Sequence, residues 1–68
     1  MAPAEIKQLE AYLKKVFEFG AIEVRKMPKK QDSVEVYVRD EFVGVIYRDE
    51  EDGEVSYQFQ MAILSEDL

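Results

Sequence analysis

The spacing at which apolar residues recur along this 68-residue chain changes once, near residue 21, and this change restricts the folds that the chain can adopt. Beyond that point apolar and polar residues alternate, which is typical of strands with one buried face. Before it, five apolar residues recur at helical spacing and form one stripe: Ile6, Leu9, Leu13, Val16 and Phe17. The sequence therefore predicts an amphipathic helix over about residues 3–19, followed only by strands.

Both ends of the predicted helix carry suitable residues. Pro3 fits the first helical turn, and Glu5 lies near the positive end of the helix dipole. Gly20 is expected to adopt the left-handed conformation that often follows the last helical residue. Tyr12 and Phe19 widen the apolar stripe, so the helix needs a broad surface, such as a sheet, to cover it.

Alternating segments after residue 20 predict four strands, over about 21–27, 33–39, 42–48 and 54–64. Pro28 ends the first, because proline cannot donate a ladder hydrogen bond. Gly53 is expected to take a positive φ in the turn before the last strand. Short connections favour a meander in which successive strands are antiparallel neighbours.

The second and third strands must form a tight hairpin, with its turn at Arg39-Asp40 or at Asp40-Glu41. These two registers differ by two residues, so both give each side chain the same face. One face is expected to hold Val34, Val36, Val38, Val43, Val45 and Tyr47. The opposite face is expected to hold Tyr37, Phe42, Gly44 and Ile46.

Together these elements predict a single α+β domain over residues 1–68, with the order α-β-β-β-β and the helix packed on one face of the sheet. For a mass of 7.9 kDa, the folded surface is expected to be about 4,400 Å². The expected core contains Ile6, Leu9, Leu13, Val16, Phe17, Ile22, Val24, Val34, Val36, Val38, Val43, Val45, Tyr57, Phe59, Met61 and Ile63.

The amino-acid composition excludes most classes of catalytic mechanism. The chain has no histidine and no cysteine, so it lacks the commonest proton-transfer group, the thiolate nucleophile and the soft metal ligands. The acidic segment 49–54 does not fit a calcium loop, because aligning Gly53 with the invariant glycine puts Arg48 and Phe59 at ligand positions. The three glycines are isolated and form no phosphate-binding loop. We expect no enzyme activity, no catalytic residues, no cofactor and no metal site.

Charge restricts the partners. The net charge of −6 opposes binding to nucleic acid, which requires basic side chains at the phosphates. Residues 1–30 carry seven basic and four acidic side chains, whereas residues 31–68 carry two basic and eleven acidic ones. The basic cluster of Lys26, Lys29 and Lys30 is either a solubilising loop or a contact for an anion. The sequence shows no signal peptide and no membrane-spanning run, so we expect a cytoplasmic protein.

The sheet face opposite the helix suggests an interface. The single helix covers only the other face, and this one is expected to carry several large apolar groups with a polar rim, a combination common in protein interfaces. Aromatic and arginine side chains are enriched at binding hot spots. The candidate interface residues are Tyr37, Arg39, Phe42, Ile46, Arg48 and Leu64.

Five segments of the sequence resemble a family of short bacterial proteins, of an alphaproteobacterial type, that carry a domain of unknown function. The segments are residues 5–13, 33–38, 40–45, 48–53 and 56–64, so the resemblance extends over nearly the whole length of the chain. It implies small cytoplasmic proteins with no assigned activity and no defined catalytic residues.

The leading hypothesis is a small acidic interaction module without enzyme activity, which forms a homodimer or binds another protein through its uncovered sheet face or a strand edge. The alternative is a monomeric adaptor that binds a partner or an anionic ligand through its charged loops. An enzyme is the third alternative.

Overall fold

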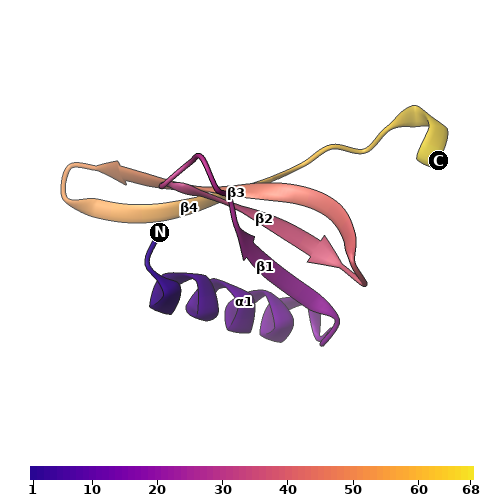
Figure 1. Cartoon of the computed structure of the whole chain (residues 1–68), viewed down its shortest axis with the longest axis horizontal. Helices are drawn as coiled ribbons and strands as arrows, with labels where there is room; N and C mark the ends of the chain where they lie inside the picture. The colour runs from indigo at the N-terminus through magenta and orange to yellow at the C-terminus, as the bar shows by residue number, and fades with distance from the viewer.

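Helix α1 leads into a four-stranded antiparallel sheet in the computed structural model, which describes residues 1–68 (Figure 1). The strands follow the chain in the order β1-β2-β3-β4, so the sheet is a meander with β1 and β4 at its edges. The predicted α-β-β-β-β architecture is confirmed. The elements are α1 Pro3–Phe17, β1 Ile22–Lys26, β2 Ser33–Val38, β3 Glu41–Glu51, β4 Glu54–Met61 and the 3₁₀ turn η1 Ser65–Asp67.

Helix α1 ends two residues earlier than predicted. Glu18, and not Gly20, takes the left-handed conformation, with φ of 51°. The N–H of Phe19 then donates to the carbonyl of Lys14 at 3.1 Å, which satisfies one of the free carbonyls at the end of the helix. This early reversal brings the Phe19 side chain against the core.

A β-bulge in β3 reverses the predicted facing of most of that strand. The turn lies at Arg39-Asp40, where both residues have positive φ, as the first of the two predicted registers requires. However, Val36 pairs with Gly44 while Tyr37 pairs with Phe42, so Val43 is an extra residue without a partner. Because side chains alternate with a period of two, one inserted residue exchanges the faces beyond it.

The corrected facing moves four predicted residues. Ile46 lies opposite Val34 and is only 2% exposed in the core, and Gly44 is also on this helix side of the sheet. Val45 and Tyr47 lie instead on the opposite face, called the outer face below, with Tyr37 and Phe42. The prediction that Val45 and Tyr47 join the valine face, and that Gly44 and Ile46 oppose it, was therefore wrong.

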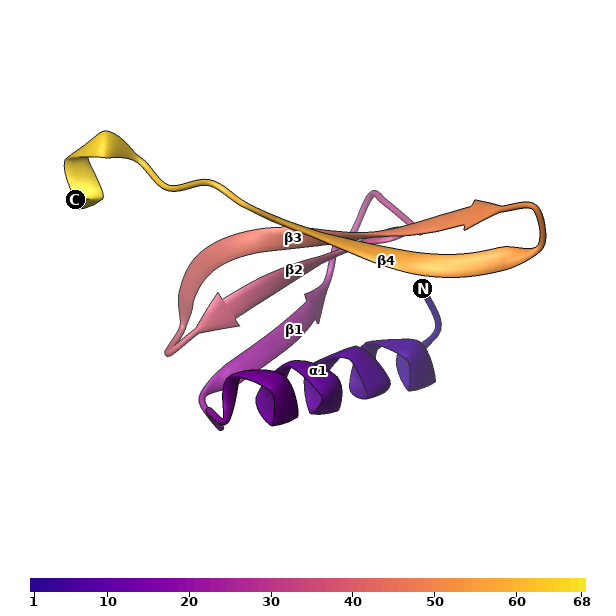
Figure 2. The ribbon, with the colours of Figure 1, turned by 180° about the vertical axis from the view of Figure 1, so that it is seen from behind.

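The buried core is small because α1 lies against β1 and leaves much of the helix side of β4 uncovered (Figure 2). Six apolar residues are buried: Leu13, Ile22, Val24, Val34, Val36 and Ile46. Several residues predicted in the core are exposed instead: Val16, Phe17, Tyr57, Phe59, Met61 and Ile63. The sheet is wider than one helix can cover, and the total surface is 5484 Å², against the expected value of about 4,400 Å².

Strand β4 ends at Met61, three residues before its predicted end. Met61 pairs with Gly44, next to the bulge, and no residue of β3 pairs with the chain beyond that point. The segment from Ala62 to Leu68 leaves the sheet and projects away from the body of the molecule (Figures 1 and 2).

Gly44 is required by the close approach of β4. A Cβ atom at this position would lie 2.5 Å from the carbonyl oxygen of Gln60 and 2.6 Å from the Phe59 ring. We expect Gly44→Ala to lower the free energy of unfolding by about 1–3 kcal/mol, because β4 must shift to make room. Gly20→Ala is the matched control, since a Cβ there meets nothing within 4 Å. Urea unfolding followed by circular dichroism measures both, and equal effects would contradict this account.

Candidate protein-interaction surface

An apolar groove runs between α1 and β4 on the helix side of the sheet. It consists of two adjoining hollows that share Leu13 and Phe59, and every lining residue is hydrophobic. We call this surface the α1–β4 groove. Its lining residues are Leu9, Tyr12, Leu13, Phe17, Phe19, Ile22, Val36, Val38, Val43, Ile46, Tyr57, Phe59 and Met61.

The groove arises because α1 and β4 each carry a row of apolar side chains, and the two rows do not fill the space between them. The apolar stripe of α1 is broader than its contact with β1, so Tyr12 and Phe17 remain more than half exposed. Strand β4 alternates, and its apolar side chains Tyr57, Phe59 and Met61 face the helix side. No further element of the chain crosses the space between these two rows.

A polar cluster joins α1 to the sheet at one end of the groove. The Tyr57 hydroxyl donates to Glu5 Oε2 at 2.6 Å, and Arg48 Nε lies 3.3 Å from the same oxygen. Arg48 also pairs with Glu50 through its terminal nitrogen at 3.2 Å. Arg48 Nε is buried and forms no hydrogen bond, so the adjacent Glu5 carboxylate supplies its charge partner. The cluster fixes the start of α1 against β3 and β4.

These contacts shift two pKa values in opposite directions. The hydrogen bond from Tyr57, together with one from the Ala2 N–H at 3.1 Å, lowers the pKa of Glu5 below its ordinary value of 4.5. The same bond to the Glu5 carboxylate raises the pKa of Tyr57 above its ordinary value of 10.0. The ionised carboxylate and the neutral phenol are therefore the favoured pair near neutral pH.

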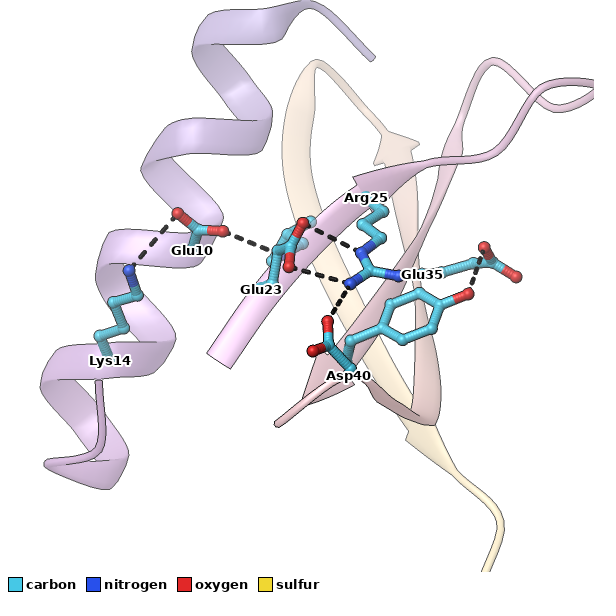
Figure 3. Close-up of polar contacts among 8 residues, drawn as sticks. Glu10, Lys14, Glu23, Arg25, Glu35 and Asp40 are labelled. Carbon is cyan, nitrogen blue, oxygen red and sulfur yellow. Dashed lines mark hydrogen bonds and ion pairs between the residues drawn. The ribbon is translucent and has the colours of Figure 1, made fainter. Parts of the chain in front are cut away.

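The outer face carries polar contacts where an interface was predicted (Figure 3). The Arg25 guanidinium lies 3.9 Å from the centre of the Tyr37 ring, pairs with Asp40 at 2.8 Å and pairs with Glu23 at 3.0 Å. The Tyr37 hydroxyl donates to Glu35 at 3.2 Å. Tyr37 is thus partly covered within the chain itself.

The six residues predicted as an interface do not form one patch. Tyr37 and Phe42 pack edge to face on the outer face, with ring centres 5.8 Å apart. Ile46 is buried, and Arg48 lies on the helix side against Glu5, because the bulge moved both across the sheet. The other two are also displaced: Arg39 is in the turn over the Phe19 ring, and Leu64 lies beyond the end of β4.

The charged loops show no assembled site. Lys26 ends β1, Lys29 and Lys30 lie in the following turn, and all three are exposed and outside the ion pairs of the structure. No group of three or more acidic, histidine or cysteine residues is placed to hold a metal ion. No helix combines the length and the apolar character needed to cross a membrane.

The fold and the groove define a small α+β protein with an open meander sheet that a single helix half covers. A family model for a protein of unknown function, DUF3126, matches residues 5–67, and the chain belongs to that family. No curated protein and no solved structure matches the chain. The family assignment agrees with the resemblance seen in the sequence and brings no functional residues with it.

The Glu5 cluster makes folding stability depend on pH. Because the folded-state pKa of Glu5 lies below 4.5, its contribution is present above the unfolded-state pKa and is lost as the pH falls through the folded-state value. We expect the free energy of unfolding to fall between about pH 5 and pH 3, and Glu5→Gln to make this fall smaller. Denaturant titrations at a series of pH values measure the free energy of unfolding of both proteins.

The control is Glu66→Gln, which removes an exposed carboxylate outside the ion pairs. Part of the pH dependence is expected to remain in both variants, because the hydrogen bond from Arg25 also lowers the pKa of Glu23. An unchanged slope in Glu5→Gln would contradict the role given to this cluster.

Proposed function

We propose that this protein is an interaction module without enzyme activity that self-associates by burying the α1–β4 groove. The observation that carries the proposal is the surface area of 5484 Å², which exceeds the value of about 4,400 Å² expected for a monomer of this mass. The excess, on the order of 1,000 Å², is comparable with the roughly 800 Å² per partner buried in an interface of standard size.

The character of the groove supports the same conclusion. Interface centres are more apolar than their rims, and they are enriched in aromatic residues and methionine. The α1–β4 groove is lined only by hydrophobic residues, including Phe17, Phe59 and Met61, and the polar pair Glu5 and Arg48 lies at one end of it. The outer face, by contrast, mixes apolar residues with charged ones.

Few polar groups converge on the groove. Ligand and active sites usually combine an apolar wall with several converging polar groups. Here the charged groups at the groove are those of the Glu5 cluster, and they are paired with one another. The absence of histidine and cysteine from the chain supports a binding role in place of a catalytic one.

Light scattering tests the proposal. We expect a dimer of twice the 7.9 kDa chain mass at both low and high salt, because apolar burial is not screened by ions. Met61→Lys should weaken the dimer roughly tenfold to a hundredfold, which corresponds to about 1.4–2.8 kcal/mol.

The matched control is Phe42→Lys on the outer face. Met61 and Phe42 are 54% and 50% exposed, so the two variants add the same charge at comparable exposure. Phe42→Lys should leave the dimer intact. A monomeric native protein would contradict self-association, and a greater loss with Phe42→Lys would place the interface on the outer face.

A further inference from the structure

The two edges of the sheet differ in whether their backbone groups are satisfied. An exposed strand edge presents unpaired N–H and C=O groups to which another strand can add. At the β1 edge, the N–H of Val24 donates to the Glu10 side chain of α1 at 3.0 Å (Figure 3). Charged side chains and the nearby Pro28 protect this edge further. The helix therefore occupies one outward backbone group in the middle of β1 and hinders strand addition there.

The hydrogen-bond pattern of the sheet shows which backbone N–H and C=O groups of β4 have no partner strand. The N–H of Arg48 donates to the carbonyl of Asp32 at 2.8 Å, so Arg48 and alternate residues of β3 bond toward β2. The residues between them bond toward β4, where Val45 pairs with Gln60 and Tyr47 with Gln58. Because the pattern alternates, the N–H and C=O groups of Tyr57, Phe59 and Met61 point away from β3 to the open edge.

Beyond the charged Glu54 at its start, the sequence of β4 contains no residue that protects this edge. Natural edge strands commonly carry lysine, proline or a bulge that prevents pairing with another chain. The segment from Val55 to Leu64 contains no charged residue and no proline, and β4 pairs with β3 without a bulge. The edge with the free backbone groups also carries the apolar row of the α1–β4 groove.

We propose that β4 pairs antiparallel with β4 of a second copy, about a two-fold axis at Phe59, to give a continuous eight-stranded sheet. This inference rests on the proposed self-association and specifies its geometry. The axis lies at Phe59 because this residue is the middle one of Tyr57, Phe59 and Met61, the three residues of β4 that line the α1–β4 groove. Tyr57 then lies opposite Met61 of the partner subunit, and Phe59 lies opposite Phe59 of the partner subunit. The apolar rows of the two grooves thereby become neighbours.

The charge distribution favours this orientation. The segment Asp49–Glu54 comprises the end of β3, the turn at Asp52-Gly53 and the start of β4, and it holds five of the acidic residues of the chain. An antiparallel pair places the two acidic turns at opposite ends of the new sheet, whereas a parallel pair would place them side by side. Like charges repel at short distance, so the antiparallel pair is the one with the lower electrostatic energy.

Amide hydrogen exchange tests the pairing directly. We expect the amides of Tyr57, Phe59 and Met61 to exchange fast when the protein is diluted to a monomer and slowly when it is a dimer. The amides of Gln58 and Gln60 bond to β3 and should be protected in both states. A dimer in which Tyr57, Phe59 and Met61 still exchange fast would overturn strand pairing and leave self-association through the groove intact.

Cysteine cross-linking tests the register, because the chain has no cysteine of its own. With the axis at Phe59, Gln58 faces Gln60 of the partner subunit in a non-hydrogen-bonded pair with Cα atoms about 4.5 Å apart, within disulfide range. A mixture of the Gln58→Cys and Gln60→Cys proteins should form the mixed disulfide on mild oxidation. Each variant alone should cross-link at least tenfold more slowly, since its own copies are diagonal neighbours roughly 7–8 Å apart.

Each outcome of the cross-linking experiment has a defined meaning. Efficient cross-linking of one variant alone would overturn the axis at Phe59. A dimer that forms no disulfide in either case would overturn the strand pairing itself. Light scattering on the same samples separates these results from a monomer, which would contradict the proposed function.

Discussion

The bulge at Val43 is the constraint on which the rest of the sheet depends. By inserting one residue opposite Val36, it turns Ile46 into the core and places Gly44 under the Phe59 ring. The same insertion brings Arg48 to the helix side, where it meets Glu5 and helps to fix the start of α1. Without the bulge, Val45 would take the place of Ile46, and Arg48 would lie on the outer face.

Much of the architecture follows from local patterns. The helical stripe from Ile6 to Phe17, the alternation in the later segments and the short connections were enough to predict the element order, since each pattern acts over a few residues. The strand ends were less well predicted, because the end of β4 depends on where its partner strand bulges. The predicted facing of Ile46 was wrong, because a bulge is an irregularity of one pair of strands and leaves no mark on the hydrophobic pattern.

The interaction surface was misplaced for a second reason. The alternation predicts that Tyr57, Phe59 and Met61 share the apolar side of the last strand. The prediction that they lie in the core assumes that the helix covers this whole face of the sheet. The structure shows that α1 packs over β1 and meets β4 through the hydrogen bond between Glu5 and Tyr57 at its start, so most of the apolar side of β4 stays uncovered. Periodicity identifies which side of a strand is apolar, whereas the reach of the covering element decides whether that side is buried. The bare surface therefore lies on the face with the helix.

The position of α1 accounts for both the groove and the difference between the two edges. Because α1 lies beside β1, Glu10 can reach the Val24 N–H and occupy an outward backbone group in the middle of that edge. For the same reason the helix lies far from the outward backbone groups of β4 and leaves both them and the adjacent apolar row uncovered. A second copy added at β4 would satisfy the backbone groups and cover apolar surface in one step. A partner that packed only on the groove would leave the backbone groups of the β4 edge unpaired. Strand pairing therefore accounts for both the unpaired backbone groups and the exposed apolar surface of the single chain.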